Sequence, residues 1–200
     1  MGHNGGFKTL CFEELEIVDC CVISQKAARV DVLANGIWFA NGIGVDKDEK
    51  FIVVSETFAA RYLKYHIQGP KQGELEVVLN EMIGLPDGAD CSHTTGLCYA
   101  AIVSSPPPIL KLLFSLPPVV NRFVRTLFMM TPPSLQPKPV HYGCFIELFP
   151  GDENNPPKIT RVVQDLHGED LRLITGVTEY GGKLYLGSLE NDVVGVYDLK

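Results

Sequence analysis

Residues 44–55, GVDKDEKFIVVS, recur with a single gap as residues 176–188, GVTEYGGKLYLGS. In both copies a turn leads into a run of β-branched, aliphatic and aromatic residues, which is typical of a buried strand. Residues 87–103 form a weaker third copy. A recurring strand, turn, buried strand and third strand is the pattern of β-propeller blades, although an ordinary antiparallel meander can also produce it.

The same alternation of short apolar runs and turn clusters continues outward from these copies, from Val30 to the end of the chain. The turn clusters are DKDE (46–49), GPK (69–71), TG (95–96), GDEN (151–154) and GG (181–182). With 46% hydrophobic and 20% charged residues in a chain of 200, there is enough apolar material for a core. The pattern predicts an all-β chain of about three propeller blades.

Two short turns are predicted at matched places, ANGI (40–43) and LPDG (85–88). They put Asn41 and Asp87 at equivalent points of neighbouring β units, so that two side-chain oxygens converge on one axis. Calcium takes converging oxygen ligands of this kind. The alternative is that both residues are ordinary turn formers with no ligand.

One segment, 106–133, interrupts the β pattern and is bounded by prolines. Within it, apolar residues at helical spacing predict a helix of about three turns that begins near Pro118. Three interpretations stay open. The helix caps the β domain, forms a lid over a binding mouth, or dips residues 109–130 into a membrane interface with Arg122 and Arg125 at the headgroups.

Charge and composition exclude several classes. The net charge of −7 opposes binding to nucleic acid. The start, MGHNGG, lacks the pattern of a signal peptide, and no apolar run is long enough to span a bilayer. Of the six cysteines, Cys91 and Cys98 flank the predicted turn HTTG (93–96), so they face each other either as a disulfide or as packed thiols.

The run VLANGIWFANGI (32–43) resembles the entry motif L-x-x-G-L-x-F-x-N-G-V of strictosidine synthase-like proteins. Further matches follow in the family's order: SET (55–57), RY (61–62), GPKQG (69–73), GLPD (84–87), and VTE (177–179) with GKLYLGSL (182–189). This resemblance covers residues 29–199 and is specific because the motifs are ordered.

The resemblance implies a six-bladed propeller related to the gluconolactonases, the paraoxonases and the adipocyte plasma membrane-associated proteins. Residues 29–200 then correspond to its C-terminal half, with residues 1–28 poorly matched and a helical insertion at 106–133. We therefore expect a truncated product, or association with a missing N-terminal half. An endomembrane or other membrane-associated location is also implied.

The resemblance also implies chemistry. Calcium ligands of the family match Asn41 and Asp87, which make half a site for Ca²⁺. A bound cation would assist hydrolysis of small esters or lactones, in the manner of an arylesterase. Synthases that condense an amine with an aldehyde carry a catalytic Glu where this chain has Thr175, so synthase activity is a weaker alternative. A non-catalytic, membrane-associated interaction propeller is the third hypothesis. No catalytic residue is assigned.

Overall fold

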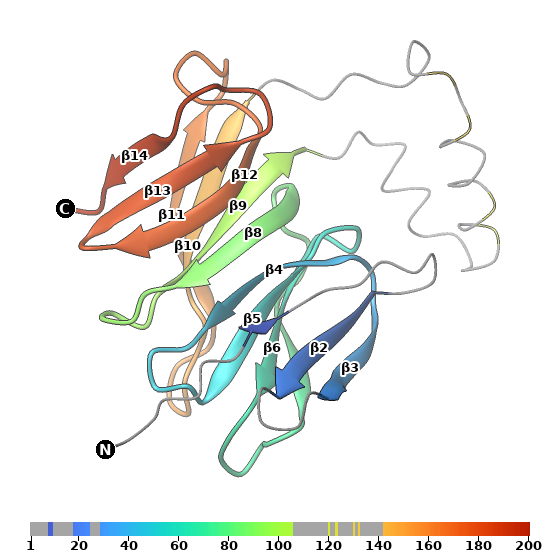
Figure 1. Cartoon of the computed structure of the whole chain (residues 1–200). Coiled ribbons are helices and arrows are strands. Elements are labelled where there is room, and N and C mark those ends of the chain that lie inside the picture. The colour runs from blue at the N-terminus through green and yellow to red at the C-terminus, as the bar shows by residue number, and fades with distance from the viewer. Residues whose placement is uncertain are drawn as a thin grey trace.

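The computed structural model describes residues 8–9, 18–24, 29–105 and 142–200, together with Val120, Phe123, Met130 and Pro132. These residues form four antiparallel sheets, which follow one another in chain order from the blue sheet to the red sheet of Figure 1. The predicted all-β class is confirmed in the described part of the chain.

Two of the sheets have four strands and two have three. The first sheet holds β1 (Lys8–Thr9), β2 (Val18–Ser24) and β3 (Arg29–Ile37). The second holds β4 (Ala40–Val45), β5 (Phe51–Glu56), β6 (Arg61–His66) and β7 (Leu75–Leu79). The third holds β8 (Leu85–Cys91), β9 (Cys98–Ser104), β10 (Gly143–Phe149) and β11 (Lys158–Asp165). The last holds β12 (Ile174–Tyr180), β13 (Lys183–Ser188) and β14 (Gly195–Asp198).

Apolar layers between consecutive sheets form the core. Because side chains alternate across a strand, β9 contributes to two layers. Ala100 and Ile102 pack with residues of β5 and β6, whereas Tyr99 and Ala101 pack with residues of β12 and β13. All four are at most 1% exposed, so β9 is buried on both faces of the third sheet. This stacking of sheets around an axis is the arrangement of propeller blades.

The segments predicted as turns at Asn41 and Asp87 are in fact inside strands, which corrects the expectation from sequence. Asn41 lies in β4 and Asp87 in β8. The pairing register shifts between Ala40 and Ile43, and again between Pro86 and Ala89, so each segment is a β-bulge. Residues that favour turns also suit bulges, because both need a local departure from extended backbone.

A disulfide joins Cys91 and Cys98, which face each other where β8 and β9 meet. Both residues are buried, at 1% and 0% exposure. The structure therefore contains the disulfide and not two packed thiols.

Reduction of this disulfide is expected to lower the free energy of unfolding by about 2–3 kcal/mol, because the bridge restricts a short loop in the unfolded chain. Urea unfolding with and without reductant measures the change. The double variant Cys91→Ala/Cys98→Ala is the control, since its midpoint should not respond to reductant. An equal midpoint for reduced and oxidised wild type would contradict the expectation.

The helical insertion at 106–133 and the poorly matched residues 1–28 both fall largely outside the described residues. The insertion stays a prediction. Of residues 1–28, the described strands β1 and β2 pair with each other, and β2 pairs with β3. Within the described ranges, no helix has the length and apolar character needed to cross a membrane.

Candidate functional site

The first strands of the last three sheets lie next to one another, β4 beside β8 and β8 beside β12. We call them the inner strands. Each carries an oxygen-bearing side chain followed by glycine at a register shift: Asn41–Gly42, Asp87–Gly88 and Thr175–Gly176. The same bulge therefore recurs at the same place in successive blades.

Glycine allows these strands to approach backbone to backbone. A Cβ added at Gly42 would fall against the backbone of residues 87–89, closer than atoms can come. A Cβ at Gly88 would likewise fall on the carbonyl oxygen of Thr175. Neither glycine has a positive φ, so close approach rather than backbone conformation requires them.

The two sequence-predicted residues meet across this contact. The Asn41 side chain hydrogen-bonds the Asp87 carboxylate. It also donates from Nδ2 to the hydroxyl of Thr57, at 3.4 Å. Thr57 in turn donates to the carbonyl of Pro86, at 2.7 Å. Thr57 is buried, at 5% exposure. Its hydroxyl therefore holds the Asn41 amide in position and links the second sheet to the third.

The negative charge of the Asp87 carboxylate is only partly compensated by its neighbours. Burial raises its pKa from the ordinary 3.8 to about 6, and the hydrogen bond from Asn41 offsets only part of this rise. The Asn41 amide donates to this carboxylate, and a bound cation would stabilise it further, because opposite charge favours the ionised form of a desolvated carboxylate. This donor chemistry fits a hard cation.

The pair is not a complete site. Calcium takes six to eight oxygen ligands, and this pair supplies only a part of them. Among the residues that the structure describes, no three His, Cys, Asp or Glu side chains form a group that could hold a metal ion.

Asp90, three residues along β8, has a different role. Its carboxylate accepts backbone hydrogen bonds from Cys91 and Glu179, both at 2.9 Å. Burial raises its pKa, while those bonds lower it. Asp90 thus joins β8 to β12, and its oxygens are already used.

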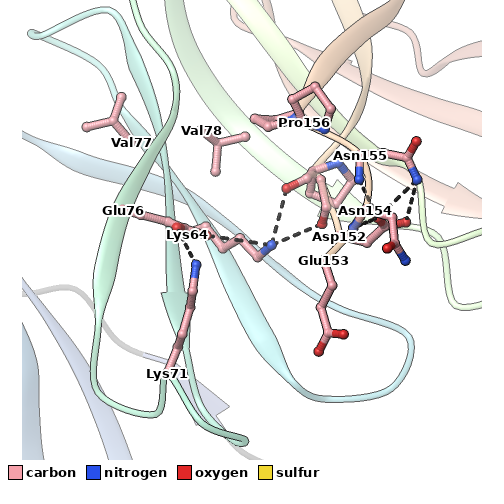
Figure 2. Close-up of a pocket in the computed structure, with 13 residues that line it drawn as sticks. Lys64, Lys71, Glu76, Val77, Val78, Asp152, Glu153, Asn154, Asn155 and Pro156 are labelled. Carbon is pink, nitrogen blue, oxygen red and sulfur yellow. Dashed lines mark hydrogen bonds and ion pairs between the residues drawn. The ribbon is translucent and has the colours of Figure 1, made fainter.

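Two cavities lie away from the pair. One, of about 300 Å³, lies between the β6–β7 hairpin and residues 150–157 and is shown in Figure 2. The other, of about 450 Å³, lies between β10–β11 and the last sheet. Neither is lined by Asn41 or Asp87.

Sequence reasoning missed Thr57. Its position was visible as part of the SET motif, but its role depends on contacts with residues 16 and 29 positions away. For Thr175 the sequence did hold a usable signal. Like Asn41 and Asp87, Thr175 has an oxygen-bearing side chain and is followed by glycine, and it comes directly after the apolar residue Ile174.

Residues 22–70 match the strictosidine synthase family. Protein STRICTOSIDINE SYNTHASE-LIKE 10 of Arabidopsis thaliana is 30% identical over 183 residues, which cover 88% of this chain and 45% of that protein. Adipocyte plasma membrane-associated protein of Salmo salar is 28% identical over 176 residues, covering 87% of this chain and 41% of that protein. The chain spans less than half the length of these relatives.

Solved structures show the same fold. A luciferin-regenerating enzyme superposes with a TM-score of 0.54 at 14% identity, covering 88% of this chain and 46% of that one. The periplasmic gluconolactonase of Pseudomonas aeruginosa gives 0.53 at 14% identity, with 90% and 46% covered. At such low sequence identity these superpositions show the fold alone. They confirm the predicted partial propeller.

Proposed function

We propose that this chain, which is related over most of its length to the strictosidine synthase-like proteins, forms one side of a metal-assisted hydrolase of small esters or lactones. The observation that carries the proposal is the hydrogen-bonded Asn41–Asp87 pair, at the same bulge of adjacent inner strands, with a desolvated carboxylate.

Asn41 and Asp87 would hold the cation through their side-chain oxygens. When bound, a divalent cation supplies Lewis-acid polarisation of an ester or lactone carbonyl. The chain's own contribution is placement. Thr57 orients the Asn41 amide, and the close approach at Gly42 fixes the spacing between β4 and β8.

The substrate class follows from two considerations. Gluconolactonases are among the proteins that share this fold, so a lactone is the first substrate to test. In the synthases that the sequence resembles, a catalytic Glu stands where this chain has Thr175, and a hydroxyl does not transfer protons as a carboxylate does near neutral pH. Amine–aldehyde condensation is therefore disfavoured.

A non-catalytic, membrane-associated role is the second candidate. Relatives named adipocyte plasma membrane-associated proteins support it. So do the exposed side chains of Phe123 and Met130, at 69% and 77%. Liposome binding without hydrolysis of any ester or lactone would favour this role over the hydrolase.

Asp87→Asn is expected to have opposite effects with and without metal. The folded-state pKa of Asp87 lies above its ordinary value, so its contribution to stability is most favourable below pH 3.8 and is lost as the pH rises through about 6. At pH 8 without metal, the variant should be more stable than wild type by about 1 kcal/mol, because solvent screening reduces the full shift. Urea unfolding at pH 4 and pH 8 tests this.

With calcium, the same variant should lose the rise in unfolding midpoint that wild type shows, along with calcium-dependent lactone hydrolysis. Asp90→Asn is the matched control from the same strand. It should be destabilised under both conditions because it weakens two backbone contacts, yet keep its response to calcium. A calcium response that survives Asp87→Asn would refute the site.

A further inference from the structure

Thr175 lies at the bulge of β12, as Asn41 does in β4 and Asp87 does in β8. In β4 the bulged pair lies between Ala40 and Ile43, which both contact one apolar layer. In β12 the pair Thr175–Gly176 lies between Ile174 and Val177, which are 4% exposed each and share another layer. The flanking residues therefore fix the orientation of the bulge in the same way in both strands.

The spatial step between inner strands repeats as well. A Cβ at Gly42 would meet the backbone of Asp87 and Gly88. A Cβ at Gly88 would meet the backbone of Thr175 and Gly176. The relation of β4 to β8 is thus reproduced between β8 and β12. Because the first step brings Asn41 to Asp87, we expect the matching second step to place Thr175 beside Asp87 on the β12 side.

We propose that the Thr175 hydroxyl is a third oxygen donor of the site, so that one amide, one carboxylate and one hydroxyl from successive blades bind a single divalent cation. This inference rests on the proposed function. A neutral oxygen suits the place, because a second carboxylate beside the buried Asp87 would add like charge that has to be compensated in the free protein. Hard cations accept neutral oxygens alongside carboxylates.

The experiment is a calorimetric titration of the chain with calcium. Thr175→Val keeps the shape and removes the oxygen, and we expect about a tenfold loss of affinity. Thr175→Ser keeps the oxygen and should bind within about twofold of wild type. Thr178→Val is the matched control, since Thr178 lies on the same strand with an exposed side chain, and it should leave the affinity unchanged.

Asp87→Asn distinguishes a failure of the role of Thr175 from a failure of the whole cation site. If Asp87→Asn abolishes binding while Thr175→Val binds as wild type does, the role of Thr175 is overturned and the Asn41–Asp87 site stands. If Asp87→Asn binds calcium normally, the proposed function fails. Equal losses in Thr175→Val and Thr175→Ser would also overturn the inference, because a lost oxygen cannot explain a defect in serine. The unfolding midpoint of each variant without calcium shows whether it is folded.

Discussion

Gly42→Ala is expected to destabilise the folded chain by about 3 kcal/mol or more. An added Cβ would meet main-chain atoms of residues 87–89, and no rotamer change can relieve such a clash. Strand β4 would have to move away from β8. The free energy of unfolding, measured by urea denaturation, reports the loss.

The matched control is Gly176→Ala, at the same place of the bulge in β12. There the nearest atoms to a new Cβ are those of Gly187 at 3.7 Å, which is ordinary contact. We expect a change below about 1 kcal/mol in either direction, because alanine also reduces the freedom of the unfolded chain. Similar losses in the two variants would mean that close approach of β4 to β8 is not the cause.

This prediction bears on function as well as stability. The contact that excludes a side chain at Gly42 also sets the distance between β4 and β8, which carry Asn41 and Asp87. A Gly42→Ala chain that still folds should therefore bind calcium more weakly than wild type. The fold and the candidate site share one structural requirement.

Lys64→Met is expected to cost about 2–4 kcal/mol of stability. Lys64 lies in β6, with its side chain 7% exposed. Its Nζ donates to the carbonyl oxygens of Pro150 at 3.3 Å and Gly151 at 3.1 Å. Dashed lines from the labelled Lys64 in Figure 2 mark its interactions. Methionine would fill the space but leave these carbonyls without their donor, and buried unpaired carbonyls are costly.

The remaining contacts of Lys64 explain how a buried ammonium is tolerated. Glu76 lies 3.8 Å away, and the ring centroid of Phe51 is 4.3 Å from Nζ. Burial lowers the pKa of Lys64 more than Glu76 raises it, so these contacts hold the charge against a desolvation cost. Together they fasten the second sheet to the loop that joins β10 and β11.

Lys71→Met provides the control for charge. Lys71 also pairs with Glu76, at 3.3 Å, but its side chain is 56% exposed. Exposed pairs contribute little, so the loss should stay below about 1 kcal/mol. Urea midpoints of the two variants compare them directly, and equal losses would show that the carbonyl contacts of Lys64 do not stabilise the fold.

The candidate site was only partly predictable. Asn41 and Asp87 stood at matched positions of the sequence, and the structure brings their side chains into contact. Their role in metal binding stays a proposal. Thr57 was visible within the SET motif but its role was not, and Lys64 gave no local signal, because each acts through partners far along the chain. The bulges were mistaken for turns, since the same residue types favour both.

By itself the sequence determined the all-β class, the recurring blade unit and the facing of Cys91 and Cys98. These properties follow from the order of apolar, turn and cysteine residues over short stretches, where neighbours in the chain are neighbours in space. Only the tertiary structure decided that Asn41 meets Asp87, how closely the inner strands approach, and that a buried lysine joins the second sheet to the loop between β10 and β11. Those features depend on the stacking of whole sheets, which brings together residues that local patterns do not connect.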